Sequence, residues 1–393
     1  MTIAKKIEGF IEQSSWIRKM FEEGTRLKKK HGAENVFDFS LGNPNLPPPA
    51  RFDDILKETI ATLEASGHGY MPNTGYPGVR NAIAEFVSRE QNTSLSGDEI
   101  TMTCGAAGAL NIVFKAILDP GDEVISPAPF FVEYRFYVDN HGGVLKTVPT
   151  HEDFTLDLDA FEAAISPRTK AVIINSPNNP TGQVYSRAAL DALGALLAAK
   201  SREAGHPIYL ISDEPYRKII YDDIPVPSIF SCYADTVMCT SYSKDISIPG
   251  ERIGFVAISP NATFKQQLSM GIALANRILG FVNAPALMQR IVARMQGDSV
   301  DIAKYRRKRD KLCDLLGDCG YEFTRPAGAF YLFPKAPIAD DVAFARTLAD
   351  ELVLVVPGSG FGGPGHVRIA YCVDDSVIEN ARPGFEKAMA KYR

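Results

Sequence analysis

The sequence lacks the features that would direct the protein into a membrane or onto a polyanion. No stretch reaches the roughly 18 uninterrupted apolar residues that a membrane-spanning helix needs. Charges are scattered through the first dozen residues, so we expect no secretory signal peptide. The formal net charge is -5, and the run Lys28-Lys29-Lys30 is short and typical of a solvated helix end. We therefore expect no binding to nucleic acid or to an anionic membrane.

The sequence also lacks paired cysteines. Its six cysteines stand singly, at positions 104, 232, 239, 313, 319 and 372. None forms a Cys-x-x-Cys pair or a cluster with the spacing of metal ligands, so we expect no metal site. The simplest location for such a chain is the reducing cytoplasm.

The length and composition suit one large domain and one smaller domain. The chain has 393 residues, of which 45% are hydrophobic and 23% charged, as is usual for a compact globular protein. Leu46-Pro47-Pro48-Pro49 ends any regular structure, because prolines remove backbone donors and fix φ. We interpret this tract as a crossover between domains, although it is also compatible with a rigid surface loop. The predicted domains are 46–289, and 1–45 together with 290–393.

Helix and strand patterns alternate from residue 53 onward. Helices are predicted over 78–89 and 107–118, and strands over 100–103, 123–125, 144–148, 171–174, 208–211, 236–240 and 254–258. Several of the strand runs are apolar throughout, as expected for strands that helices cover on both faces. The pattern predicts a mostly parallel α/β sheet, in which ligands bind at the carboxyl ends of the strands.

A different pattern follows residue 290. A long charged helix is predicted over 301–316, followed by strands over 329–333, 352–356 and 367–371 and by a final helix. The first forty residues resemble an amphipathic arm that leads into a short strand over 36–39. The C-terminal pattern predicts a smaller α+β domain.

Unusual polar residues directly follow four of the predicted strands. They are Asn175-Ser176-Pro177-Asn178-Asn179-Pro180-Thr181-Gly182, Ser212-Asp213-Glu214-Pro215-Tyr216, Ser241-Tyr242-Ser243-Lys244 and Cys104-Gly105-Ala106-Ala107-Gly108. Each has an ordinary interpretation alone: a turn, a helix cap at Asp213, a solvated Lys244, and a tight strand-to-helix connection. Because all four point to the same edge of one sheet, together they indicate a site.

With these motifs the sequence resembles the class I/II aminotransferases of fold type I, which use pyridoxal phosphate (PLP) and include the aspartate aminotransferases. Matching motifs run from Leu41-Gly42-Asn43-Pro44 to Arg368, and the most specific is residues 241–244 followed eight residues later by Arg252. The resemblance implies a mostly parallel seven-stranded sheet between helices plus a smaller α+β domain. It also implies transfer of an amino group from an L-amino acid to a 2-oxo acid by a ping-pong mechanism.

The resemblance assigns the chemical roles to a few residues. Lys244 would form the Schiff base with the cofactor and later carry a proton between the substrate and the cofactor. Asp213 would face the pyridine nitrogen and keep the ring protonated, which makes it a better electron sink. Asn179 and Tyr216 match the positions that hydrogen-bond the phenolic oxygen of the cofactor.

The remaining cofactor contacts are also implied by the resemblance. The phosphate would bind the helix start and nearby side chains: Gly105, Ala106, Ala107, Ser241, Arg252 and, as a weaker candidate, Ser243. Phe131 stands where the family places an aromatic ring stacked on the cofactor, although Phe131 is also compatible with ordinary core and Phe130 with the stacking role. Tyr70 matches a tyrosine that reaches the phosphate of a neighbouring subunit, which implies a homodimer with shared active sites.

The substrate contacts would come from both ends of the chain. Arg368 matches the residue that binds the α-carboxylate, with Gly42 and Asn179 beside it. Arg277 lies near the position of an arginine that binds the distal carboxylate in dicarboxylate-specific relatives. Its spacing to Asn283 does not match cleanly, and a salt-bridged surface arginine is the alternative.

Two other functions are compatible with parts of the pattern. Some relatives of the same fold are β-lyases, decarboxylases or synthases, because PLP chemistry branches at one common intermediate. A non-catalytic ligand-sensing domain would normally be fused to a DNA-binding module, for which we expect no room before Leu41. The combination of Lys244, Asp213 and Arg252 favours catalysis.

Overall fold

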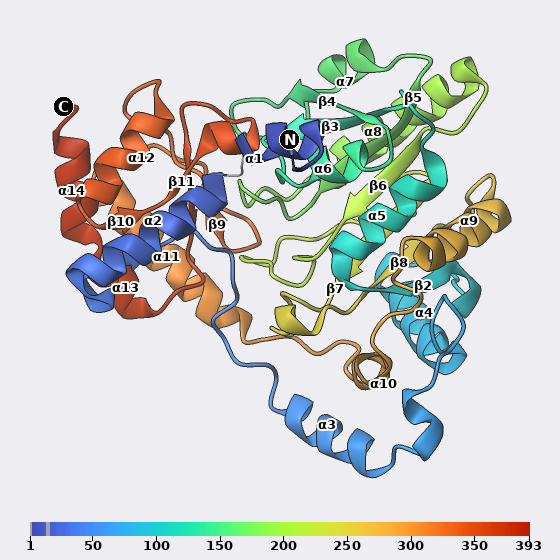
Figure 1. Ribbon diagram of the computed structural model, residues 1–393. Helices are drawn as coiled ribbons and strands as arrows, with labels where there is room; N and C mark the ends of the chain where they lie inside the picture. Colours follow the sequence, from blue (N-terminus) through green and yellow to red (C-terminus); the bar gives the residue numbers. More distant parts are fainter. Residues whose placement is uncertain (1, 13–15) are drawn as a thin grey trace.

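The computed structural model describes residues 2–12 and 16–393, and within these ranges a seven-stranded sheet forms the centre of the larger part of the molecule (Figure 1). The order across the sheet is β2 (Ile100–Thr103), β8 (Gly254–Ile258), β7 (Thr236–Ser241), β6 (Tyr209–Asp213), β5 (Thr169–Asn175), β3 (Glu123–Ala128) and β4 (Val144–Pro149). β8 runs antiparallel to both of its neighbours, whereas β7, β6, β5, β3 and β4 are mutually parallel. The predicted mostly parallel α/β sheet is confirmed.

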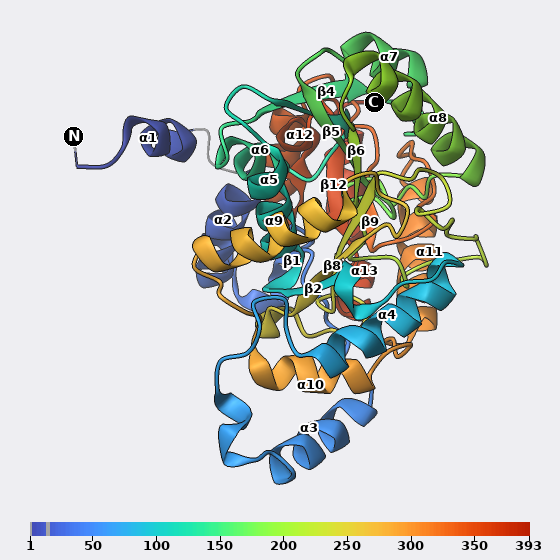
Figure 2. The same ribbon diagram turned by 90° about the vertical axis from the view of Figure 1, so that its right-hand side faces the viewer.

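Helices cover both faces of this sheet (Figures 1 and 2). On β5, Val172 and Ile174 pack into one apolar cluster and Ala171 and Ile173 into another. The first cluster includes residues of α3 (Arg51–Ala61), α4 (Pro77–Gln91), α7 (Leu158–Ala164), α8 (Arg187–Ala204) and α10 (Ala286–Arg294). The second includes residues of α5 (Gly105–Ile117), α6 (Tyr134–Asp139) and α9 (Lys265–Ile278). Burial on both faces is why these strand sequences are apolar throughout instead of alternating.

The smaller part contains, among the described residues, a three-stranded antiparallel sheet and a separate parallel pair of strands. The sheet has the order β11 (Val356–Pro357), β12 (Val367–Ala370), β9 (Tyr331–Leu332), and the pair is β1 (Phe37–Asp38) with β10 (Val353–Leu354). Helices α2 (Trp16–His31), α11 (Ile302–Asp318), α12 (Asp341–Asp350), α13 (Asp375–Asn380) and α14 (Arg382–Ala390) complete it (Figure 1).

The predicted strand over 352–356 divides into two. β10 pairs with β1, whereas β11 pairs with β12, so Val355 lies at a change of partner. The preceding Leu352 has a left-handed backbone, with φ at 61°. Two short strands that pair with different neighbours therefore share one continuous apolar run of sequence.

The chain crosses between the two parts near the proline tract. Phe39 donates a backbone hydrogen bond to Leu354 (2.9 Å) and accepts one from Ala370 (2.9 Å). Residues 46–49 have no regular structure and lead to α3, at the far end of the larger part (Figure 1). The domain boundaries at 46 and 289 stay a prediction.

Helix α1 (Lys5–Glu12) projects from the body of the molecule (Figure 2). It contacts α6 through the ion pair of Lys6 with Asp139 (2.5 Å) and the edge-to-face rings of Phe10 and Phe136 (4.9 Å). No helix among the described residues is long and apolar enough to cross a membrane.

The close approach of β8 to the start of α5 explains a glycine and gives a stability prediction. A Cβ on Gly254 would collide with the carbonyl oxygen of Thr240 and lie 3.0 Å from the backbone of Gly105. We expect Gly254→Ala to lower the free energy of unfolding by about 1–3 kcal/mol, since overpacking forces the backbone to shift.

Chemical denaturation measures this change. Gly250→Ala is the matched control, because no described atom outside its chain neighbours lies within 4 Å of a Cβ at that position. Equal stabilities of the two variants would contradict the prediction.

Candidate active site

The four polar segments after β2, β5, β6 and β7 meet at one cavity of about 290 Å³. The smaller part of the molecule closes its other side. The sequence-predicted residues that line it are Gly42, Ala106, Ala107, Phe131, Asn179, Asp213, Tyr216, Ser241, Ser243, Lys244, Arg252 and Arg368. The structure thus brings together residues that lie up to 326 positions apart, from Gly42 to Arg368. Their individual roles stay predictions.

Lys244 lies three residues beyond the end of β7, with its amine facing the cavity. The Nζ atom donates a hydrogen bond to the carbonyl oxygen of Gly42 (2.8 Å). It lies 6.0 Å from the ring centre of Tyr216 and 5.6 Å from that of Phe330. Burial lowers the pKa of Lys244 to about 8. A useful fraction of the amine is therefore neutral, and so nucleophilic, near neutral pH.

Asp213 is the last residue of β6 and is buried. Its Oδ2 accepts a hydrogen bond of 2.5 Å from the hydroxyl of Tyr134, in α6. Its Oδ1 is also buried and has no hydrogen-bond partner among the described residues. Burial raises the pKa of Asp213 to about 7, the bond from Tyr134 opposes this rise, and the charge of Glu214 adds to it. The unpartnered oxygen leaves room for a donor from a ligand.

The hydroxyl of Tyr216 forms a hydrogen bond with that of a second tyrosine inside the cavity. Its hydroxyl lies 2.9 Å from the hydroxyl of Tyr331, in β9. Burial raises the pKa of Tyr216 well above its usual value, so the phenol is neutral at physiological pH. A Cβ on Gly42 would collide with the Tyr331 hydroxyl, so only glycine fits there without displacing this pair.

Arg368, in β12, is buried and held from several sides. Its Nη1 donates to Asn179 Oδ1 (3.2 Å) and its Nη2 to the carbonyl oxygen of Ser40 (2.5 Å). The guanidinium lies 4.8 Å from the ring centre of Tyr331 and 4.7 Å from that of Phe361. Its Nε finds no partner in the part of the chain that the structure describes. A fixed cation with unused donor capacity suits a carboxylate ligand.

Asn175 joins the two neighbouring strand ends. Its Nδ2 donates to the backbone carbonyl of Asp213 (2.8 Å), and its Oδ1 accepts from the backbone N–H of Asn179 (2.7 Å). One amide side chain at the end of β5 therefore fixes both the end of β6 and the loop that presents Asn179 to Arg368.

The start of α5 lies beside Arg252 at the other end of the cavity. Gly105 has φ at 71°, and a Cβ there would lie 3.0 Å from the Nη2 of Arg252. Arg252 has a left-handed backbone itself and donates to the carbonyl of Pro249 (3.1 Å). The first N–H groups of a helix have no partner within the helix, so with an arginine they form an anion site. Ser241 and Ser243 are buried against the same cavity.

Three predicted site residues do not line the cavity: Gly105, which lies beside Arg252 at its end, and two further residues, Tyr70 and Arg277. Tyr70 is 93% exposed, and Arg277 is exposed near the end of α9. The segment that follows Tyr70 contacts the end of α9, which carries Arg277. Asn276 donates a hydrogen bond to the carbonyl oxygen of Asn73 (2.7 Å), and Asn73 donates one to the carbonyl oxygen of Val282 (2.7 Å). Neither Tyr70 nor Arg277 lines the cavity of its own chain.

The structure separates the two candidate stacking rings. Phe131 lines the cavity, with its ring 5.6 Å from that of Tyr134. Phe130 is buried in the core, next to Gly362. Phe131 is therefore the ring that a ligand in the cavity can reach.

Sequence reasoning missed the roles of Tyr134, Tyr331 and Asn175. Tyr134 follows the proline and phenylalanine run by three residues, in a segment for which the sequence predicts no helix or strand and therefore no direction for the side chain. Tyr331 stands inside an apolar strand pattern, where a tyrosine hydroxyl needs a buried partner. That requirement was the available signal. Asn175 was read only as part of a turn.

Comparisons with known proteins agree with this geometry. A family model described as aminotransferase class I and II matches residues 34–383. The aspartate/prephenate aminotransferase of Thermus thermophilus is 34% identical over 374 residues, which cover 93% of this chain and 94% of that protein. The aspartate aminotransferase of Geobacillus stearothermophilus is 32% identical over 400 residues, which cover 97% of each.

Solved structures are similar as well. An amino transferase from Eubacterium rectale has a TM-score of 0.97 and 43% identity over 100% of both chains. The aspartate aminotransferase from Thermus thermophilus solved with maleate has a TM-score of 0.85 and 28% identity, covering 99% of this chain and 100% of that one. These comparisons do not favour a lyase, a decarboxylase or a ligand sensor.

The hydrogen bond between Tyr134 and Asp213 gives a prediction about pH. Tyr134→Phe removes the bond that lowers the pKa of Asp213, so this pKa should rise above about 7. A hydrogen bond to a charged group contributes about 1.5–3 kcal/mol, which corresponds to a rise of about one pH unit or more. The carboxylate form, which would attract a protonated pyridine nitrogen, would then persist only at higher pH. PLP affinity should fall as the pH drops through the pKa of Asp213. In Tyr134→Phe we expect this fall to occur about one pH unit or more higher than in the wild type.

Titration of the full chain with PLP between about pH 5.5 and 9 measures the shift, a range that brackets the pKa of Asp213. Tyr185→Phe is the matched control, because Tyr185 is a buried tyrosine in the opposite apolar cluster. If PLP affinity depends on pH in the same way in Tyr134→Phe and in the wild type, the bond from Tyr134 does not set the pKa of Asp213.

Proposed function

The chain belongs to the class I and II aminotransferases and is a PLP-dependent aminotransferase, and we propose that it works through the cavity that Lys244 and Asp213 line. The proposed reaction moves the amino group of aspartate to 2-oxoglutarate, or that of glutamate to a different 2-oxo acid. One observation carries the assignment of the site: a buried carboxylate oxygen without a partner among the described residues and a lysine with a lowered pKa face the same cavity.

The residues present fit PLP. The orphaned Oδ1 of Asp213 would accept a hydrogen bond from the pyridine nitrogen, and Lys244 would hold the aldehyde carbon. The phosphate would lie on the first turn of α5, beside Ser241 and Arg252. When bound, PLP supplies an electron-withdrawing ring that stabilises negative charge at the α-carbon of an attached amino acid.

The side chains of this chain then perform the remaining tasks. Lys244, whose pKa is about 8, takes a proton from the substrate α-carbon and returns it. Arg368 binds the α-carboxylate and thereby fixes which bond at the α-carbon faces the reacting group. Tyr216 stays protonated and donates a hydrogen bond into the cavity, with Tyr331 holding its hydroxyl. Phe131 covers one wall and excludes water.

The proposal of a dicarboxylate substrate rests on relatives. Several of them are named aspartate aminotransferases, and one of those was solved with maleate, a dicarboxylate. Arg277 is the residue proposed to bind the distal carboxylate. It does not line the cavity of its own chain, so the contact requires a second copy.

We propose a homodimer in which Tyr70 and Arg277 serve the neighbouring cavity. α9 exposes an apolar stripe of Met270, Leu274 and Ile278, spaced by four residues so that they share one face. Their exposed fractions are 74%, 48% and 55%, which is unusual for three successive apolar residues on one helix face. Burial of this stripe against a second copy would bring Arg277 and Tyr70 to the interface.

We also propose a cytoplasmic location. All six cysteines lie in the described ranges and are free, as is typical of proteins in a reducing compartment.

The role of Lys244 is tested by covalent capture of the cofactor. Reduction of the native holoenzyme with borohydride, followed by peptide mass spectrometry, should locate PLP on Lys244. Lys244→Ala should show neither the attached cofactor nor its visible absorption, and turnover should fall by several orders of magnitude, because one amine provides both attachment and proton transfer. Lys57→Ala, on an exposed face of α3, is the control. Attachment at another lysine would refute the assignment.

The substrate is tested by adding single amino acids without an acceptor and following the visible absorption of bound PLP. Aspartate and glutamate should convert the enzyme at lower concentrations than neutral amino acids. Arg277→Leu should lower kcat/KM for aspartate by roughly 10- to 100-fold, the loss of one charge-assisted contact, and leave neutral amino acids unaffected. Arg346→Leu, exposed on α12, is the matched control. An unchanged aspartate rate would exclude Arg277 from the site.

A further inference from the structure

Behind the cavity, a cluster of buried and partly buried charges lies at the bases of the segments that carry Asp213 and Lys244. It consists of Glu90, Glu214, Arg217, Lys218 and Asp245, and we call it the rear charge cluster. We propose that Arg217 and Lys218 are positioning residues that hold the ends of β6 and β7 through Glu214 and Asp245. This inference rests on the roles proposed above for Asp213 and Lys244.

The chain places an acid directly after each of the two reactive residues. Glu214 follows Asp213, and Asp245 follows Lys244. Asp213 and Lys244 line the reaction cavity, whereas Glu214 and Asp245 line a second, smaller cavity behind it. Two consecutive cations, Arg217 and Lys218, each meet one of these acids.

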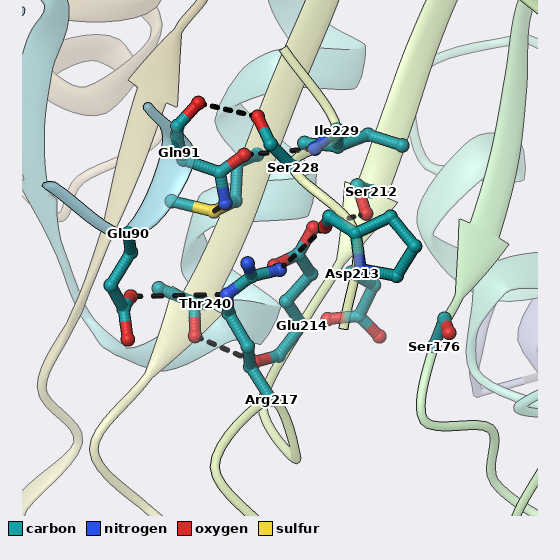
Figure 3. A network of polar contacts seen from close by, with 12 residues as sticks. Glu90, Gln91, Ser176, Ser212, Asp213, Glu214, Arg217, Ser228, Ile229 and Thr240 are labelled. Carbon is teal, nitrogen blue, oxygen red and sulfur yellow. Dashed lines mark hydrogen bonds and ion pairs between the residues drawn. The ribbon is translucent and has the colours of Figure 1, made fainter. Parts of the chain in front are cut away.

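The first ion pair joins a buried carboxylate to a partly buried guanidinium. Glu214 is 3% exposed, and its carboxylate accepts hydrogen bonds from Ser212 (2.6 Å) and Arg217 (2.9 Å). Figure 3 shows the Glu214 side chain directed at these two residues, whereas the Asp213 carboxylate points away from them. Arg217 also donates to the carbonyl oxygen of Pro227 (3.3 Å).

The backbone of Glu214 connects the two strands. Its N–H donates to the carbonyl of Cys239 (2.8 Å), in β7. Its carbonyl accepts from the hydroxyl of the next residue of β7, Thr240 (2.9 Å; Figure 3). Movement of Glu214 would therefore displace Asp213 on one strand and the base of the Lys244 segment on the other.

The second ion pair holds the Lys244 segment. Lys218 Nζ lies 3.2 Å from Asp245 Oδ2 and 4.9 Å from the ring centre of Phe86. Asp245 Oδ1 accepts from the backbone N–H of Ile246 (2.9 Å), and the Asp245 carbonyl accepts from Val300 (2.7 Å). The residue next to the reactive lysine is thus fixed by its side chain and by its backbone.

The fifth member, Glu90, joins the cluster to α4. Its Oε2 lies 3.8 Å from Arg217 Nε, and burial raises the pKa of Glu90. The following residue, Gln91, accepts hydrogen bonds from Ile229 N (2.8 Å) and from the Ser228 hydroxyl (2.5 Å), which anchors the end of the helix (Figure 3). The cluster therefore connects α4, β6 and β7 behind the cavity.

Buried ion pairs of this kind contribute little net stability, but removing one partner leaves an uncompensated charge. An unpaired Glu214 would move toward water, and this movement would displace Asp213. Replacing both partners by neutral groups removes that penalty. This difference separates a positioning role from simple packing.

The test compares Arg217→Met with the double variant Glu214→Gln/Arg217→Met in the native holoenzyme. We expect Arg217→Met to weaken PLP binding by roughly tenfold or more and to lower kcat by a similar factor, as expected for a buried charge left unpaired. KM for the amino acid should stay within about threefold, because Arg368 is untouched. The double variant should recover both PLP affinity and kcat to within a few-fold of wild type. Arg187→Met, which breaks an exposed ion pair with Asp191, is the matched control.

PLP affinity is measured by fluorescence titration well below the melting temperature of each variant. If Arg217→Met lowers only the melting temperature, with PLP affinity and kcat unchanged, the cluster is structural and the inference is wrong. If Arg217→Met does not fold, Arg217→Gln takes its place in the same comparison, and a folded Arg217→Gln variant with the PLP affinity and kcat of the wild type refutes the inference. Failure of the wild-type enzyme to transaminate would instead refute the proposed function.

Discussion

The parallel register of β5, β6 and β7 is the constraint on which the active-site geometry depends. Asn175 pairs with Asp213 across one ladder, and Asp213 pairs with Cys239 across the next. Hydrogen bonds between strands fix these pairings, so the three carboxyl ends coincide at one edge of the sheet. The polar segments that follow these three strands therefore start side by side at this edge. The side chain of Asn175 and the backbone of Glu214 add bonds between the same strand ends.

The sequence predicted the sheet because strands buried on both faces have a simple signature, and it predicted most of the cavity because polar residues follow those strands. It could not predict Tyr134, which contacts Asp213 from α6, or Tyr331, which lines the cavity from β9. Their directions depend on how a helix and a short strand pack, which local sequence does not encode. The division of residues 352–356 between β10 and β11 was missed for the same reason, since the change of partner is a tertiary property. Tyr70 and Arg277 lie away from the cavity, so one chain cannot show their contacts.

The site keeps three buried or partly buried charged groups close together, with incomplete pairing. Asp213 Oδ1 and Arg368 Nε are buried without partners among the described residues, and Lys244 has a lowered pKa. Each feature costs folding free energy, because desolvated polar groups lose their bonds to water. A ligand that satisfies these groups recovers that free energy, so cofactor binding and native-state stability are coupled. The arrangement of these groups therefore favours the folded chain with a bound ligand over the folded chain without one.

The pairing of β1 with β10 has a consequence for how the chain folds during synthesis. Phe37 pairs with Val353, so a strand near the N-terminus acquires its partner only after more than three hundred further residues have left the ribosome. By contrast, the strands of the seven-stranded sheet all fall between Ile100 and Ile258, and the helices that cover it fall between Arg51 and Arg294. The larger part can therefore collapse while the early strand is still exposed. Closure of the loop between β1 and β10 is a late event with a high entropic cost, and the active site cannot be completed before it.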